Sequence, residues 1–281
     1  MISINRVMQK NIMSVDLEDY FCDLPFSTWE NYESRVSNST RILLDLFEKY
    51  NVTASFFTLG YIAEKHPELI EDIKSKGHEI ASHGYSHTDI RNMTKESFEA
   101  DLVKSLEIIK KITGEKVLGF RAPFFSIEEK NFWAIDIIKK LLRYDSSIFP
   151  IKSPLYGIPN APRFLYSMSD ENPLQVEKTS NFIEIPPATL RISGIGNIPI
   201  AGGFWLRFLP VDLINYGIKK INKKGFPAMC YIHPKDLDPE FPRINEYSWH
   251  YYWGLRNSEK KFEALLKKFE FGSVREVVLE N

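Results

Sequence analysis

Short apolar segments alternate with amphipathic segments through the first half of this 281-residue chain. The apolar runs have the length of strands, and they lie at 11–17, 54–59, 78–81, 117–120 and 144–148. The intervening segments repeat apolar residues three and four positions apart, as helices do; they begin near Ser39 or Thr40, at Pro67, at Thr94 and at Ser126. Strict alternation of this kind is typical of parallel βα units. We therefore predict an α/β fold around a parallel sheet.

The second half of the chain is less regular. Residues 149–203 are rich in proline, glycine and serine and predict an elaborated loop region, with short strands at 182–185 and 189–192. Further elements are expected as a helix at 210–222, a strand at 227–232, an aromatic loop at 234–257, a helix at 258–269 and a strand at 273–279. Because no linker-like stretch divides the sequence, we predict a single domain over 1–281 with loop elaborations at about 149–203 and 234–257.

Composition excludes several classes of protein. The chain is 43% hydrophobic with a formal net charge of −1, and it has no basic run, which argues against a nucleic-acid partner. Cys22 and Cys230 are too few for a disulfide scaffold or a cysteine-rich zinc module. The sequence has neither an apolar run of membrane-spanning length nor a signal-peptide pattern at 1–13, so we expect a cytoplasmic protein without a membrane span. The oligomeric state stays open.

Polar residues fall at, or just past, the carboxyl ends of predicted strands. They are Asp16, His83, Arg121, Asp145 and His233. In a parallel βα barrel these strand ends meet on one face, where such folds carry their chemistry. Five separate stretches would thus bring acids, imidazoles and a guanidinium group into one site.

His83 and His87 are four residues apart, and their imidazoles can converge on one ion if the backbone between them turns helically. Two neutral imidazoles and one carboxylate leave a coordination position open on a divalent ion, which lowers the pKa of a bound water. A second carboxylate can then act as general base and a separate histidine as general acid. This set of residues therefore predicts metal-assisted hydrolysis.

Several motifs resemble, in the same order, those of the polysaccharide deacetylases (the chitooligosaccharide deacetylase homology domain, carbohydrate esterase family 4). They are Ser14-Val15-Asp16 with Glu18-Asp19, the pair His83 and His87, Arg121-Ala122-Pro123-Phe124, Asp145-Ser146-Ser147 and Tyr231-Ile232-His233. The resemblance spans about 12–235 and is most specific over 54–87. Gly202-Gly203-Phe204, Arg207 with Pro210, and His233-Pro234 are similar to the branch tied to bacterial exopolysaccharide synthesis.

This resemblance implies a distorted (β/α) barrel with an irregular number of strands, fewer than eight, and a divalent metal that is most often zinc. It implies that Asp16 is the general base, that Arg121 holds Asp16, and that His233 is the general acid. It also implies that His83 and His87 bind the metal, and that a backbone N–H near Phe124 helps to hold the oxyanion.

The sequence departs from the family pattern at the third metal ligand. The family has two adjacent aspartates, whereas Leu17 follows Asp16 here, so the carboxylate ligand is Glu18 or Asp19, with a slight preference for Asp19. Gly84 stands where the family usually has serine or threonine. The residue that orients His233 is also open, with Asp145 and Glu184 as candidates.

The expected function is hydrolysis of the N-acetyl group of an amino sugar in a surface polysaccharide, glycan precursor or glycoconjugate. One alternative is an amidase that acts on a small cyclic or linear amide, which a deep closed pocket would favour. Another is a catalytically silent glycan-binding domain. An open groove lined by the aromatic residues at 249–253 would favour a glycan over a small amide.

Overall fold

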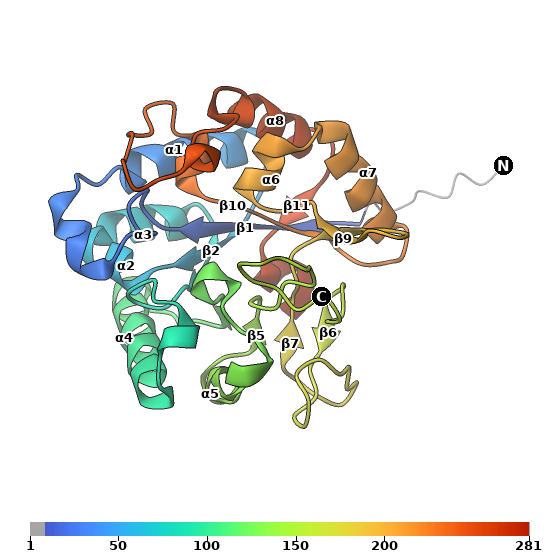
Figure 1. Ribbon diagram of the computed structural model, residues 1–281. Coiled ribbons are helices and arrows are strands. Elements are labelled where there is room, and N and C mark those ends of the chain that lie inside the picture. Colours follow the sequence, from blue (N-terminus) through green and yellow to red (C-terminus); the bar gives the residue numbers. More distant parts are fainter. Residues whose placement is uncertain (1–8, 281) are drawn as a thin grey trace.

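Parallel strands form a curled sheet wrapped by helices in the computed structural model, which describes residues 9–280 (Figure 1). The main path through the sheet has the order β10-β1-β2-β3-β4-β5-β7-β6. Neighbouring strands pair in parallel, except that β6 is antiparallel to β7.

The strands of the main sheet are β1 (Asn11–Leu17), β2 (Ser55–Thr58), β3 (Glu79–Ser82), β4 (Gly119–Phe120), β5 (Tyr144–Asp145), β6 (Tyr166–Ser167), β7 (Ile183–Glu184), β10 (Met229–Ile232) and β11 (Phe271–Gly272). A separate antiparallel pair consists of β8 (Thr189–Ile192) and β9 (Gly196–Pro199). The helices are α1 (Val36–Lys49), α2 (Gly60–Lys65), α3 (Pro67–Ser75), α4 (Lys95–Thr113), α5 (Trp133–Leu141), α6 (Gly203–Phe208), α7 (Val211–Asn222) and α8 (Ser258–Leu266).

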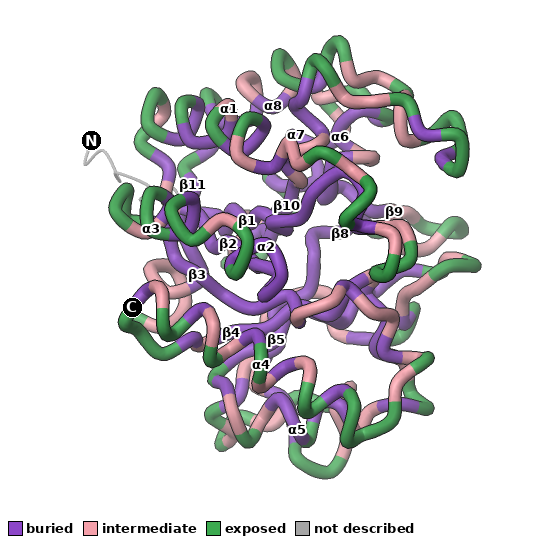
Figure 2. Tube along the Cα trace, turned by 90° about the vertical axis from the view of Figure 1, so that its left-hand side faces the viewer, coloured by how far each residue is buried: buried purple, intermediate pink, exposed green. Residues whose placement is uncertain are grey.

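The sheet closes on itself just past β7. Pro187 forms a parallel bridge with Met229 of β10, and the Ala188 N–H donates to the Met229 carbonyl at 2.9 Å. Figure 2 shows the buried strands curled at the centre of the molecule, with exposed residues on the outer helices. The predicted distorted (β/α) barrel is confirmed. The predicted domain bounds of 1–281 include residues 1–8 and 281, which lie outside the described residues.

The barrel interior is layered because side chains on a strand alternate between its two faces. An apolar layer is formed by Ile12, Phe57, Ala81, Tyr144, Ile185, Met229 and Val274. The same face continues two or four positions further along the strands, toward their carboxyl ends, and there it carries Asp16, His83 and His233. The same alternation therefore directs apolar side chains into the barrel at the amino ends of the strands and polar side chains into it at their carboxyl ends.

Helix α1 begins earlier than predicted and α5 begins later, because of contacts with residues outside each helix. Helix α1 starts at Val36, ahead of Ser39, because the Asp19 carboxylate accepts the N–H groups of Arg35 and Val36 and so holds the N-terminus of the helix. Helix α5 starts at Trp133, since the Ser126 hydroxyl donates to the Pro123 carbonyl and does not cap a helix. Helix α4 is capped by Thr94 and ends at Gly114, as its pattern predicts.

The predicted strand at 273–279 is wrong. Only Phe271–Gly272 pairs with β1, because β2 takes the positions along β1 from Ser14 onward. The chain then turns into one π-helical turn at Arg275–Leu279, which packs on the apolar layer at the lower end of the barrel. No helix within residues 9–280 combines the length and the apolar character needed to cross a membrane.

His78 is a buried structural residue at the start of the segment that leads to His83. Its ring packs between Phe47 and Phe56 with centroids at 5.5 and 5.2 Å, and its Nδ1 accepts the Ala54 N–H at 3.1 Å. Burial, and to a smaller extent the charge of Lys76, lowers the pKa of His78 to about 4. The ring is therefore neutral in the folded protein at pH 7.

This burial predicts a loss of stability in mild acid. The pKa of His78 is about 4 when folded and about 6.5 when unfolded, so between these values the unfolded chain binds the additional proton and stability falls as pH is lowered. The loss from this residue between pH 7.5 and pH 5 should be about 2 kcal/mol. His78→Asn keeps an acceptor for the Ala54 N–H but does not titrate, and urea unfolding at the two pH values should show a smaller loss for it. Equal losses in the two proteins would contradict the assignment.

Candidate metal and catalytic site

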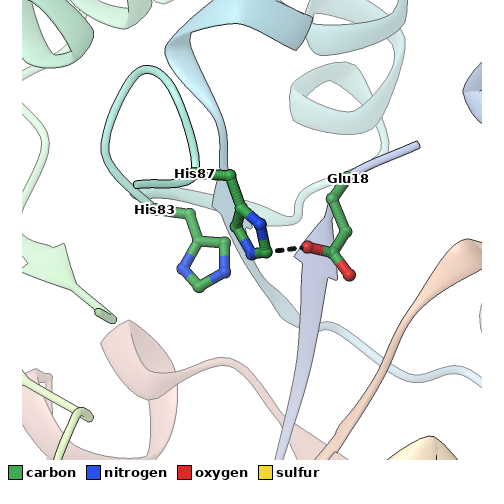
Figure 3. A group of neighbouring side chains, drawn as sticks. All are labelled: Glu18, His83 and His87. Carbon is green, nitrogen blue, oxygen red and sulfur yellow. Dashed lines mark ion pairs between the residues drawn. The ribbon is translucent and has the colours of Figure 1, made fainter. Parts of the chain in front are cut away.

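Glu18, His83 and His87 converge at the carboxyl ends of β1 and β3 (Figure 3). One potential ligand atom from each residue lies within 4.8 Å of the others, and all three side chains are buried. Figure 3 shows the ring of His87 between the other two, with an ion pair of 2.8 Å from its Nε2 to Glu18 Oε2. All three residues are among the metal ligands predicted from the sequence, and the structure brings them together.

The hydrogen bonds of the two histidines determine which ring nitrogen of each is available to a metal. His83 Nδ1 lies 2.7 Å from the Arg121 carbonyl, and His87 Nδ1 lies 2.9 Å from the Cys22 carbonyl. Because a carbonyl only accepts, each Nδ1 donates, and Nε2 of each neutral ring carries a lone pair. Glu18 Oε2 is buried and receives no well-directed hydrogen bond from the described residues. Two imidazole nitrogens and a carboxylate oxygen in this arrangement fit a divalent cation.

The histidine pair does not lie on a helical turn, contrary to the expectation from its spacing. His87 has a left-handed backbone (φ 51), and the loop between the histidines is held by Asp101 of α4, which accepts the N–H groups of Tyr85 and Ser86. A side chain at Gly84 would lie 2.9 Å from the Asp101 carboxylate, and Gly84 also has a positive φ of 76°. The loop therefore requires glycine where the family usually has serine or threonine.

Asp19 lies outside the group of Glu18, His83 and His87, which favours Glu18 over Asp19 as the candidate third ligand. The Asp19 carboxylate accepts the Ser34 hydroxyl at 2.5 Å and the N–H groups of Tyr20, Arg35 and Val36. Although these bonds favour its charged form, burial outweighs them and raises the pKa of Asp19. Its position at the N-terminus of α1 gives it a structural role.

Asp16 is held by Arg121 in a buried ion pair. The Arg121 guanidinium donates to Asp16 Oδ1 at 2.5 Å and also to the Ser14 hydroxyl at 3.0 Å. Its other nitrogens donate to the carbonyl and the hydroxyl of Ser146 at 3.3 and 2.9 Å. Asp16 Oδ2 faces His233, whose Nε2 is 3.8 Å away. One carboxylate oxygen is thus fixed, and the other points toward the space between Asp16 and His233.

Asp236 orients His233, which neither Asp145 nor Glu184 does. Asp236 Oδ2 lies 2.8 Å from His233 Nδ1 and also accepts the His233 N–H at 3.0 Å. Arg207 contacts the other oxygen of Asp236 at 3.1 Å. Burial would raise the pKa of Asp236, but the charges of Arg207 and His233 outweigh it and hold the pKa at about 2. The spacing of three residues from His233 to Asp236 is the sequence signal that could have identified this partner.

Asp145 and Glu184 are buried below the site and bind backbone and hydroxyl groups. Asp145 accepts the Ser147 hydroxyl at 2.6 Å, and Glu184 accepts the Ile148 N–H at 3.0 Å. Burial raises the pKa of Asp145 to about 6 and that of Glu184 well above its usual range. Asp145, which the sequence singled out as a strand-end residue, thus supports the loop that contacts Arg121.

Lys235 contacts Glu18 of the candidate metal site, a contact that the sequence did not predict. Its ammonium group lies 2.7 Å from Glu18 Oε1 and 2.7 Å from Asp23 Oδ2. Burial alone would raise the pKa of Glu18, but Lys235, followed by His87 and His233, holds it well below the usual range. Burial likewise disfavours the charged ring of His87, yet Glu18 outweighs it and raises the pKa of His87. Burial lowers the pKa of His83 to about 4, so that ring is neutral.

Comparison with known families agrees with this geometry. Residues 25–140 match the family described as polysaccharide deacetylase. These residues are therefore similar to the polysaccharide deacetylases. Residues 146–279 match a second family, described as a domain of unknown function (DUF3473). Glu18 precedes the first match, His83, His87 and Arg121 lie within it, and Arg207, His233 and Asp236 lie within the second.

Two curated relatives and one solved structure illustrate the similarity. A peptidoglycan deacetylase from Helicobacter pylori is 38% identical over 106 residues, which are 38% of this chain and 36% of the relative. A peptidoglycan-N-acetylglucosamine deacetylase from Bacillus cereus is 33% identical over 95 residues, 34% of each chain. The similarity thus spans about a third of the length of these relatives. A Mycobacterium smegmatis structure assigned to the polysaccharide deacetylases has a TM-score of 0.61 at 17% identity and covers 94% of this chain and 87% of its own, which shows a shared fold.

The geometry predicts that Glu18, and not Asp19, contributes to metal binding. Glu18→Gln should weaken zinc binding at least ~100-fold, because it removes a charged ligand from a site that otherwise has two neutral imidazoles. Asp19→Asn keeps the shape of the side chain and should leave zinc affinity within about threefold, while lowering the free energy of unfolding by ~1 kcal/mol through lost hydrogen bonds. Isothermal titration with zinc and urea unfolding measure the two effects. Zinc binding that is lost in Asp19→Asn and kept in Glu18→Gln would reverse the assignment.

Proposed function

We propose that the protein is a metal-dependent N-deacetylase of an amino sugar in a surface polysaccharide, glycan precursor or glycoconjugate. The observation that carries the proposal is the arrangement of three groups around one space. His233 Nε2 is 3.6 Å from Glu18 Oε1 and 3.8 Å from Asp16 Oδ2, so a candidate acid faces both the candidate metal ligands and the candidate base. Such an arrangement suits the hydrolysis of an amide, which needs a base for water and an acid for the amine.

Glu18, His83 and His87 would hold the ion, and zinc is the first choice because two of the three ligands are imidazoles. When bound, a divalent ion supplies an activated water and polarises the acetyl carbonyl. Asp16 accepts the proton of the attacking water at Oδ2, since Oδ1 is occupied by Arg121. As the carbon–nitrogen bond breaks, His233 Nε2 donates a proton to the leaving amine while Asp236 holds Nδ1. The products are acetate and a free amino sugar.

The acetylated substrate class is supported by the relatives, whose names describe deacetylases of peptidoglycan. The motif Gly202-Gly203-Phe204 with Arg207 further favours the exopolysaccharide branch of the family, and hence a bacterial surface polymer or its precursor. The role of the Phe124 N–H in holding the oxyanion is carried over from the family resemblance. Phe124 has a left-handed backbone (φ 57) in the turn after Arg121, and its ring packs on His87 with centroids 4.4 Å apart.

The direct test is release of acetate from N-acetylglucosamine oligomers, N-acetylmuramic acid and N-acetylgalactosamine derivatives, with and without added zinc. Zinc-loaded protein should release acetate, and removal of the metal with a chelator should abolish this activity. The absence of acetate from every N-acetyl sugar in the panel would refute the proposed function. Release of ammonia or acid from small cyclic amides instead would favour the amidase alternative.

Two variants separate the roles of base and ligand within this test. Asp16→Asn should bind zinc normally but lose turnover by about 10²–10⁴-fold, because amide nitrogen cannot accept the proton of water. His83→Ala should lose zinc binding together with activity. Full activity in Asp16→Asn would show that another group is the base.

Asp236 generates a prediction that depends on the leaving group. Asp236→Asn removes the acceptor that aligns His233, so hydrolysis of the N-acetyl sugar should fall about 10²-fold, whereas hydrolysis of an aryl acetate should fall only a few-fold because phenolate leaves without a proton. Glu18→Gln serves as the matched control and should lose both activities together. Equal losses of amide and ester hydrolysis in Asp236→Asn would contradict its role in orienting the acid.

A further inference from the structure

Lys235 carries a charge into the interior of the protein, beside the candidate metal site. It lies in the 3₁₀ turn Pro234–Leu237 that follows β10, and its side chain is only 11% exposed. Its ammonium group donates to Glu18 Oε1 and to Asp23 Oδ2, both at 2.7 Å. A lysine is buried to this extent only where its charge is paired. The two carboxylates therefore explain how the ammonium group is tolerated, but not what it does there.

A cation beside a metal ligand opposes metal binding. Glu18 belongs to the group that would hold a divalent ion, and the positive charge of Lys235 repels such an ion. A neutral side chain at this position would give the site a higher affinity for a cation. The presence of Lys235 thus lowers the strength of metal binding, which indicates that it serves another property of the site.

The two oxygens of the Glu18 carboxylate have different surroundings. Oε1 accepts the Lys235 ammonium group, whereas Oε2 lies 2.8 Å from His87 Nε2 and receives no well-directed hydrogen bond from the described residues. A carboxylate can bind a metal ion through one oxygen or through both. The contact with Lys235 engages one oxygen and leaves the other for an ion.

The position of Glu18 in the chain makes such a contact necessary. Leu17 separates Glu18 from Asp16, and the Glu18 N–H donates to the Asp16 carbonyl at 3.1 Å just past the end of β1. A glutamate side chain has one more rotatable bond than an aspartate, so more conformers must be excluded before it presents a single oxygen to an ion. Lys235 reaches Glu18 from the end of the neighbouring strand β10 and restricts its carboxylate.

We propose that Lys235 is a positioning residue that limits Glu18 to one metal-binding oxygen, with Asp23 holding the ammonium group from its other side. This inference rests on the proposed function and specifies how the same site is kept open. Two imidazoles and one carboxylate oxygen leave coordination positions for water and for the acetyl carbonyl. The second oxygen of Glu18 would fill one of these positions. Lys235 thus lowers metal affinity and preserves turnover.

A positioning role and an ordinary structural ion pair predict opposite changes in metal affinity. If Lys235 only supported the shape of the site, its loss would weaken zinc binding and turnover together. If it limits Glu18 to one oxygen, its loss removes a repelling charge and frees a second ligand atom, so zinc binds more tightly while turnover falls.

The first test is Lys235→Met, which keeps an unbranched side chain of similar length and removes the charge. The dissociation constant for zinc, measured by titration against a competing chelator, should fall about tenfold or more. With zinc saturating, kcat for N-acetylglucosamine oligomers should fall about 10–100-fold. Lys139→Met is the matched control, because Lys139 of α5 is also largely buried (14% exposed) and pairs with an aspartate, Asp170. It should leave both values unchanged.

A spectroscopic measurement reports the number of ligands directly. Cobalt(II) in place of zinc absorbs visible light more strongly when it has four ligands than when it has five or six. Absorption per bound cobalt ion should therefore be weaker in Lys235→Met than in the native protein and in Lys139→Met. The double variant Asp23→Asn/Lys235→Met removes both charges of the pair and so avoids a second uncompensated carboxylate. It should fold even where the single variant does not, and it should show the same weaker absorption and tighter zinc binding.

The inference requires tighter zinc binding and weaker cobalt absorption in the same variant. Unchanged cobalt absorption, or weaker zinc binding, would overturn it in favour of an ordinary structural ion pair, and native turnover in a variant with both changes would overturn the role in keeping the site open. Native protein that binds neither metal would also overturn it. If no N-acetyl sugar is hydrolysed, the proposed function fails, and the zinc and cobalt measurements, which need no substrate, still decide whether Lys235 restricts Glu18.

Discussion

A guanidinium group with no exposure to solvent is stable only where charge and hydrogen-bond partners surround it, and Arg121 meets this condition at the centre of the barrel. It pairs with Asp16 of β1, donates to Ser146 beyond β5, and lies over the Phe57 ring of β2 at 4.1 Å. Its own carbonyl receives Nδ1 of His83. One residue therefore contacts residues on or just past four other strands, keeps Asp16 oriented and sets the tautomer of the His83 imidazole, a proposed metal ligand. Replacement of Arg121 by a neutral residue would leave the buried Asp16 carboxylate without its cationic partner and would weaken the orientation of His83.

The site combines parts from two family segments that share one sheet. His83, His87 and Arg121 belong to the segment that matches the polysaccharide deacetylases, whereas His233, the proposed acid, belongs to the segment of unknown function. β1 precedes both segments and lies between them, since it pairs with β2 of the first and with β10 of the second. Val15 lies beside Ile232, so the residues that follow them, Asp16 and His233, lie across from each other. The candidate site therefore needs both segments as well as the strand that precedes them.

Much of the fold and the site could be predicted from the sequence because local patterns determine them. The period of two along β1 and β10 directs Asp16 and His233 inward, and Thr94 and Gly114 bound α4 through contacts within a few residues. The choice between Glu18 and Asp19 could not be predicted, because it depends on which carboxylate the N-terminus of α1 takes, and that helix lies 17 residues further on. The chain bends after β11 because β2 already pairs with β1 from Ser14 onward, so β11 cannot extend along that strand. Lys235 became a contact of Glu18 only through the pairing of distant strands.

Gly203 and Arg207 act together in bringing α6 close to the turn after β10. A side chain at Gly203 would overlap the Asp236 carboxylate, with a Cβ only 1.6 Å from Oδ2, so glycine allows α6 to approach the turn after β10. This approach lets Arg207 reach Asp236 with Nε and the carbonyls of the aromatic loop with its terminal nitrogen. Arg207 thereby fixes both the acceptor of His233 Nδ1 and the backbone of the aromatic loop. Because both depend on one buried guanidinium, a substitution of Arg207 would disturb the His233 imidazole and the aromatic loop together.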